Sequence, residues 1–421
     1  MQNPNAEATA LKLIAYCQKN DWAGYDPYDA LNSRAIQSLP FLDTRLTRLA
    51  ATQILKRSPI NLRPLMLISR VQNPKAIGLF LSAFVKLSTV GTMRTEDLIR
   101  VMIKRLIHLR SQSVPYWCWG YTFPWQARLQ KETVAKGAPN LVCTSFVANA
   151  LLDAYEHTED AQCLNMAVSA AEYMLNELYW TRDNSPVAGF AYPVPEVRNN
   201  TYNANFLAAA LLCRVYEHTR DEKLLGPALK AARYSTAQQR ADGSWYYGEA
   251  PSQRWIDNFH TGYNLCALQA IGRYAETTEF QASVQRGFEF YRKNFFLEDG
   301  TAKYFHDRTY PVDIHCIAQS IITLLAFKDL DPGSIGLARS VFDWAMNHMW
   351  DDRGFFYYRV LRLFTVRTSF MRWSQAWMLL AIATLLCDST ARADIDVGTA
   401  SAFMGAQSPQ PTPSQPACTA D

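Results

Sequence analysis

The stretch Ala150-Leu151-Leu152-Asp153-Ala154-Tyr155-Glu156-His157-Thr158 decides the fold, because its ending recurs along the chain. Tyr216-Glu217-His218-Thr219 follows 61 residues later, and Tyr274-Ala275-Glu276-Thr277 another 58 residues on. Each copy closes one amphipathic helical pattern and is followed by a second, which predicts a series of helical hairpins. Repeats of this kind stack on their neighbours and bury a shared core.

The same rhythm extends to both sides of the repeat. Further helix pairs are expected at 74–90 with 96–113 and at 314–328 with 334–349, and a last helix at 368–386 has no downstream partner. Residues 1–70 predict a helical lead-in. If one of its helices pairs with the last helix, six hairpins close into a ring without exposed ends.

We therefore expect an all-α protein with an (α/α)6 toroid over residues 71–388 and a lead-in, 1–70, that helps to close it. Residues 389–421 are rich in Pro, Ser and Gln, a composition typical of disorder. Short loops with Gly and aromatic residues separate the hairpins. They should emerge on one face of the ring, because an even number of helices lies between them. They include Gly189-Phe190-Ala191-Tyr192, Asp242-Gly243-Ser244-Trp245-Tyr246-Tyr247, Asp299-Gly300 and Gly354-Phe355-Phe356-Tyr357-Tyr358.

Composition narrows the classes of function. The net charge of +4 on 421 residues is too balanced to favour nucleic acid as a partner. No apolar run approaches the roughly 18 residues of a transmembrane helix, and no export signal is visible, so a cytoplasmic protein is expected. We found no metal-ligand spacing, phosphate loop or dinucleotide fingerprint, and we expect neither a metal nor a cofactor.

The highest concentration of polar side chains that could act on a ligand lies where a loop meets a helix start, in Trp255-Ile256-Asp257-Asn258-Phe259-His260-Thr261-Gly262-Tyr263. Asp313-Ile314-His315 occupies the corresponding junction one hairpin later. Asp257 and Asp313 are our candidates for general acid and base, because glycoside hydrolysis needs two carboxyl groups across the bond. Each could instead serve only as the cap of its own helix. Glu249 is a reserve carboxylate.

The two histidines suggest a second kind of chemistry. His260 and His315 could take a proton from a sugar carbon, with Tyr263 donating to the leaving oxygen, as a lyase or epimerase requires. A buried structural histidine is the alternative for either one.

Other polar and aromatic residues are candidates for substrate binding. Arg372 could clamp a carboxylate while Trp373 stacks on a sugar and Gln375 hydrogen-bonds it, although Arg372 could instead pair with a neighbouring acid. Amide side chains near a further helix start could hold hydroxyl groups or cap the helix, and loop aromatics could form sugar subsites or simply pack. These residues are Asn203, Asn205, Trp117, Trp245 and Tyr246.

The toroid resembles the six-hairpin glycosidase superfamily, and more narrowly the bacterial exopolysaccharide-biosynthesis proteins that share its ring. The resemblance rests on residues 140–144, 203–205, 242–247, 257–263, 313–319 and 372–377. It implies a carbohydrate-active enzyme acting on an oligo- or polysaccharide, acidic ones included, with hydrolysis favoured over elimination or epimerisation.

Two other classes of function stay open. The first is a non-catalytic saccharide-binding or scaffold protein of exopolysaccharide biosynthesis. The second is a zinc-dependent cyclase, which the segments around Cys118 and His315-Cys316 favour only weakly. In the second segment the Cys and His stand in the reverse of the order found in such cyclases, and the glycines of their motif are missing.

Overall fold

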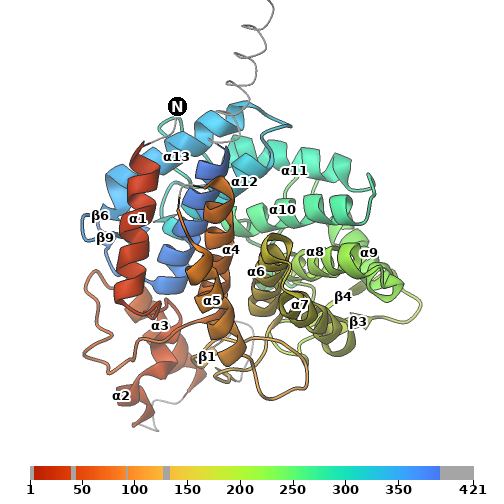
Figure 1. Cartoon of the computed structure of the whole chain (residues 1–421), viewed down its shortest axis with the longest axis horizontal. Helices are drawn as coiled ribbons and strands as arrows, with labels where there is room; N and C mark the ends of the chain where they lie inside the picture. The colour runs from red at the N-terminus through yellow and green to blue at the C-terminus, as the bar shows by residue number, and fades with distance from the viewer. Residues whose placement is uncertain (1–3, 39–43, 92, 127–132, 389–421) are drawn as a thin grey trace, which may run out of the picture.

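The computed structural model describes residues 4–38, 44–91, 93–126 and 133–388. The expected (α/α)6 toroid is confirmed, with two concentric layers of helices (Figure 1). The segment predicted to be a disordered tail, 389–421, lies outside the described residues.

Six helices form the inner layer, and each contacts the next around a closed ring. The sixth begins with a π-helical turn, η5, and continues as α-helix over 377–388. The inner helices are α4 (Pro74–Val90), α6 (Leu141–Thr158), α8 (Tyr202–Thr219), α10 (Asn258–Tyr274), α12 (Ile314–Ala326) and η5 (Met371–Ala376) with its continuation.

Each inner helix packs against one helix of the outer layer. In chain order these outer helices are α5 (Glu96–His108), α7 (Ala161–Tyr173), α9 (Glu222–Ala237), α11 (Gln281–Asn294) and α13 (Gly333–Met349). The sixth outer position is filled from the other end of the chain by α1 (Pro4–Lys19), which contacts η5.

Three loop glycines show that α1 occupies an outer-helix position. Gly243, Gly300 and Gly354 all have φ near +90°, a conformation that favours glycine. A Cβ on Gly243 would lie 2.3 Å from a backbone oxygen of α11, and one on Gly300 would lie 2.5 Å from a backbone oxygen of α13. A Cβ on Gly354 would meet the backbone oxygen of Lys12 in α1 at 2.8 Å. The last loop therefore packs against α1 as the earlier loops pack against the next outer helix.

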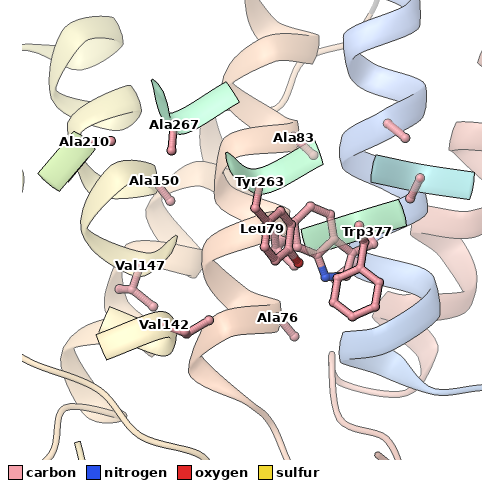
Figure 2. Close-up of a cluster of buried hydrophobic side chains, with 14 of the residues drawn as sticks. Ala76, Leu79, Ala83, Val142, Val147, Ala150, Ala210, Tyr263, Ala267 and Trp377 are labelled. Carbon is pink, nitrogen blue, oxygen red and sulfur yellow. The ribbon is translucent and has the colours of Figure 1, made fainter. Parts of the chain in front are cut away.

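Small side chains allow the inner helices to approach closely. Figure 2 shows Ala76 and Ala83 of α4, Ala150 of α6 and Ala267 of α10 within the buried cluster. Burial of a continuous apolar surface between neighbouring repeats is the main stabilising contribution to such a ring.

Helix starts gather on one face because every inner helix runs in the same sense. Side-chain caps mark four of them: Asn73, Asn140, Asp257 and Asp313 each accept a hydrogen bond from a backbone N–H of the first turn. Polar residues in these first turns are thus brought to the same end of the ring.

Shorter elements connect the helices. They are η1 (Asp29–Asn32), α2 (Arg34–Gln37), α3 (Arg45–Arg57), η3 (Met174–Leu178), η4 (Pro251–Gln253), β1 (Trp125–Gln126), β2 (Thr133–Val134), β3 (Tyr179–Thr181), β4 (Ala188–Phe190), β5 (Val312–Asp313), β6 (Trp350–Asp351), β7 (Phe355–Phe356), β8 (Arg359–Val360) and β9 (Thr365–Val366). The strands pair in antiparallel fashion, as β1 with β2, β3 with β4, β6 with β7, and β8 with both β5 and β9. Within the described residues, no helix combines the length and apolar character needed to cross a bilayer.

Candidate active site

The centre of the candidate site is a carboxylate and imidazole pair at the start of α10. Asp257 accepts from the backbone N–H of His260 at 3.0 Å, so it does cap its helix. Its second oxygen accepts from Nδ1 of His260 at 2.7 Å and from Nε1 of Trp255 at 2.9 Å. Because a carboxylate oxygen accepts, Nδ1 of His260 is the donor in this pair, and in the corresponding neutral tautomer Nε2 carries the lone pair.

The side chain of His260 lines a recess of about 190 Å³. In this conformation the recess has no space for a water molecule, so its walls must move apart before water or a ligand can enter. The residues lining it are Asn203, Trp245, Tyr246, Tyr247, Trp255, Asp257, His260, Thr261 and Asn264. Nε2 of His260 has no hydrogen-bond partner among the residues the structure describes.

Two amide oxygens of the recess also lack partners. Oδ1 of Asn203 and Oδ1 of Asn264 are buried and accept no hydrogen bond within the described part of the chain. A buried acceptor without a donor costs roughly 1–3 kcal/mol. A ligand that presents two hydroxyl donors here would remove that cost.

Five tyrosines from successive loops surround the same end of the ring. They are Tyr28, Tyr121, Tyr192, Tyr247 and Tyr304, and each is half-buried. Burial raises the pKa of Tyr192 to about 12, and its electrostatic interaction with Tyr28 adds to the shift. The pKa of Tyr247 is raised well above its usual value by burial, with contributions from Tyr192 and Asp257. These interactions show that loops far apart in sequence converge here, with neutral phenols.

His315 and Tyr263 lie beneath the recess, in an aromatic layer. The Tyr263 hydroxyl and Nε2 of His315 are 2.6 Å apart, and His315 stacks between Phe259 and Trp377. Burial, with smaller contributions from nearby cations, lowers the pKa of His315 well below its usual value, so the ring is neutral. Figure 2 shows Tyr263 beside Trp377, and their ring centroids are 5.6 Å apart.

Asp313 does not fit the acid or base role that the sequence predicted. Nε and Nη2 of Arg359 donate to one of its oxygens at 2.8 and 2.5 Å. Nε1 of Trp373 and the backbone N–H of His315 donate to the other at 2.8 and 3.0 Å. The side chain is fully buried and its acceptor positions are filled, so no lone pair is left for a substrate.

Arg372 is also engaged in an ion pair within the protein, which corrects its predicted role as a clamp for a substrate carboxylate. It donates to both oxygens of Asp26, at 2.6 and 2.8 Å, in a buried ion pair. The alternative reading, a pairing with an acid, is the correct one. Gln375 is similarly engaged with the backbone of Phe356 in both directions, so it holds a loop rather than a ligand.

Two further predicted residues, Asn205 and Glu249, have structural partners. Oδ1 of Asn205 accepts from the backbone of Phe190 at 2.9 Å, and its amide donates to Asn200 and Ser235. Glu249 is exposed and accepts from Asn200 and Tyr234 away from the recess lining.

Trp245 borders the recess but is 1% exposed, so it offers no face for stacking. Trp117 lies under the guanidinium of Arg110 at 4.6 Å, and its backbone contacts α7. Of the predicted aromatic platforms, only Tyr246 is both at the recess and partly exposed.

Several central residues escaped the sequence reasoning. Lys75 is buried with its Nζ 3.9 Å from the centroid of Phe146, and burial lowers its pKa well below the usual value. Asn264 and the five loop tyrosines were also missed. For Lys75, a charged residue in the first turn of an otherwise apolar helix was the available signal. The sequence around Arg359 gave no such signal, because its partner Asp313 lies 46 residues away.

Within the described residues, no three or more His, Cys, Asp or Glu side chains form a group that could hold a metal ion.

One family model matches part of the chain, and several solved structures share its fold. Residues 142–310 match the family model for Glycosyl Hydrolase Family 88. Among curated protein sequences, none matches this chain.

Several solved structures share the toroid at low sequence identity. Cellobiose 2-epimerase from Bacillus thermoamylovorans aligns with a TM-score of 0.57 and 14% identity, over 76% of this chain and 90% of its own. Unsaturated glucuronyl hydrolase from Streptococcus agalactiae aligns with a TM-score of 0.58 and 11% identity, over 91% and 90%. A family 76 α-mannanase from Bacteroides thetaiotaomicron gives a TM-score of 0.58 and 12% identity, over 79% and 90%. At these identities the likenesses show the toroid fold alone.

Proposed function

We propose that this carbohydrate-active enzyme hydrolyses a glycosidic bond at the recess beside Asp257 and His260. The family 88 match and the toroid support a glycoside hydrolase. The observation that carries the assignment to this recess is the Asp257 and His260 pair, which orients a half-buried imidazole whose Nε2 has no partner among the described residues.

His260 is the proton-transfer group in this proposal. Its Nε2 takes a proton from the attacking water, and Asp257 stabilises the imidazolium that forms, as an orienting carboxylate does in other histidine-based sites. As the water oxygen bonds to the anomeric carbon, the bond from that carbon to the departing oxygen breaks, and the proton that His260 took passes to the departing oxygen, which leaves as an alcohol. The ring centroids of Tyr247 and His260 are 4.7 Å apart, edge to face, and the Tyr247 hydroxyl stays protonated, so it can donate a hydrogen bond to the departing oxygen.

Binding would use the two orphaned amide oxygens and the tyrosines. Oδ1 of Asn203 and Oδ1 of Asn264 need donors, which vicinal sugar hydroxyls supply. Aromatic rings such as those of Tyr246 and Trp255 give apolar surface to a sugar face. The resemblance to exopolysaccharide-biosynthesis toroids favours a bacterial oligo- or polysaccharide as the substrate.

The test is a reducing-end assay over a panel of neutral and acidic bacterial glycans, with near-ultraviolet absorbance read in parallel. Elimination would create an unsaturated sugar that absorbs, whereas hydrolysis creates reducing ends alone. His260→Gln should lower kcat about 100-fold or more on any glycan cleaved by the parent protein.

His218→Gln is the matched control, because His218 lies at the far end of its helix and contacts Glu156. It should keep the parent rate. A His260→Gln protein that cleaves at the parent rate, or a parent protein that binds glycans but never turns them over, contradicts the proposal. The second outcome would instead support a saccharide-binding protein.

Epimerisation is the second candidate function, because two imidazoles, His260 and His315, occupy neighbouring helix starts. It is less favoured, since His315 is 1% exposed and its Nε2 is already bonded to Tyr263. Deuterium uptake from D2O into a sugar carbon, without new reducing ends, would identify this reaction.

A further inference from the structure

Lys75 is a buried amine that the hydrolysis proposed above does not use. It lies in the first turn of α4, where its backbone N–H donates to the cap residue Asn73 at 3.0 Å, so it belongs to the same end of the ring as His260. The residue is 2% exposed. Its Nζ forms neither a hydrogen bond nor an ion pair with any residue that the structure describes, yet it is not one of the fully occluded polar atoms. The tip of the amine therefore retains some accessible surface.

Three aromatic rings from three other inner helices surround this amine. Nζ lies 3.9 Å from the ring centroid of Phe146 in α6, 5.4 Å from that of Tyr263 in α10 and 5.3 Å from that of Trp377 in the last inner helix. Figure 2 shows the last two rings within the buried cluster. Burial, with a contribution from the Arg372 guanidinium, lowers the pKa of Lys75 well below its usual value. An amine held neutral in this way keeps its lone pair and is a nucleophile.

A hydroxyl and an imidazole adjoin the amine. The Tyr263 ring contacts Lys75, and the Tyr263 hydroxyl is 2.6 Å from Nε2 of His315. Nδ1 of His315 is buried and has no partner within the described part of the chain, so no contact fixes which ring nitrogen carries the proton. When Nε2 carries it, the imidazole donates to the phenol oxygen, and the phenol O–H is free to donate elsewhere. The cluster thus combines a nucleophile with a hydroxyl that can pass protons.

We propose that Lys75 condenses with the open-chain aldehyde of a reducing sugar. A neutral amine lacks the charge with which a lysine attracts anions, and the group that such an amine attacks is a carbonyl carbon. Reducing sugars offer that carbon in their open-chain form, and glycoside hydrolysis at the recess would release one at this end of the ring. The proposal goes beyond that hydrolysis and does not require it, because any aldose that enters supplies the aldehyde.

The step produces an imine and water. The lone pair of Nζ bonds to C1 of the sugar while the π bond of the C1 carbonyl breaks. Both N–H protons of the amine pass in turn to the carbonyl oxygen, relayed by the Tyr263 hydroxyl, and that oxygen leaves as water. C1 and Nζ are then joined by a double bond, and no oxidant or reductant takes part. The aromatic surroundings favour this product, because its formation expels a water molecule from a site that holds little water.

The experiment is reductive trapping of the imine on the full chain. The protein is incubated at about pH 6.5 with cyanoborohydride and one of four aldehydes, glyceraldehyde, glucose, galactose or mannose, and lysine adducts are mapped by mass spectrometry of its peptides. Reduction fixes the imine as a secondary amine, which adds the mass of the sugar less one oxygen. We expect the adduct on Lys75 to form at least about tenfold faster than on the exposed Lys230, because a solvated lysine is almost entirely protonated at this pH.

Matched controls accompany the trapping. Methyl glucoside, whose C1 is locked as an acetal, should label neither lysine. Lys75→Met should lose the fast adduct and keep the slow labelling of Lys230. Tyr263→Phe, shown to be folded by its melting curve, should label Lys75 about tenfold more slowly than the parent chain.

Labelling of Lys75 that is absent, or no faster than that of Lys230, with every aldehyde including the small glyceraldehyde would overturn the proposal. An unchanged labelling rate in folded Tyr263→Phe would overturn the proton relay. None of these assays contains a glycosidic bond to be cleaved, so their failure is distinct from a failure of the proposed hydrolysis.

Discussion

Replacing Asp313 by Asn should destabilise the protein far more than it affects any proton-transfer step. Asp313 is fully buried, and its charge balances Arg359, which is itself only 10% exposed. An asparagine keeps the acceptor for Trp373 and His315, but its amide N–H groups would face the guanidinium donors. Removing one partner of a buried ion pair costs about 3–5 kcal/mol, and we expect the unfolding free energy to fall by that amount.

Urea unfolding followed by tryptophan fluorescence measures this loss, and a double-mutant cycle with Arg359→Met isolates the pair. The double variant should recover part of the stability, because it leaves no unpaired buried charge. Asp351→Asn is the control: its partner Arg353 is 75% exposed, so the loss should stay below about 1 kcal/mol. If Asp313→Asn unfolds like the parent chain but abolishes glycan turnover, the structural role is wrong and Asp313 is a chemical group.

Three further outcomes follow from buried groups and close contacts. Burial lowers the pKa of Lys56 to about 7, so between pH 7 and 10 the unfolded chain binds more protons than the folded one, and the free energy of unfolding rises with pH. Lys56→Met should be more stable than the parent chain at pH 7, and urea titrations should show this difference in stability shrinking as the pH rises to 10. Tyr263→Phe removes the 2.6 Å contact to the buried Nε2 of His315 and should lower the free energy of unfolding, measured in urea, by about 1–3 kcal/mol. An unchanged free energy of unfolding would mean that the imidazole finds another partner. Gly354→Ala places a Cβ at positive φ against α1 and should lower the melting temperature. Gly336→Ala, at an open position in the first turns of α13, should leave the melting temperature unchanged or raise it. A parent-like melting temperature for Gly354→Ala would argue against the close packing of α1.

The fold was predictable from local features of the sequence. The repeated helix endings and the apolar period of 3.6 residues predicted the hairpins, since both are properties of a few neighbouring turns. Asp257 and Asp313 were correctly placed at helix starts for the same reason: a capping side chain bonds to a backbone N–H two or three residues away.

The division of roles between those two aspartates needed the tertiary structure. They look alike in sequence, as acids two or three residues before a histidine. Only the folded ring brings Arg359 to Asp313 and leaves Asp257 bonded to an imidazole that lines the recess.

The sequence by itself therefore determined the ring of helices and the end at which its polar residues collect. Tertiary structure decided which of those residues are free to act, because ion pairs form between groups that are close in space. Arg372 finds Asp26 across 346 positions of chain, and no pattern within a few helical turns could have revealed that its charge was already balanced.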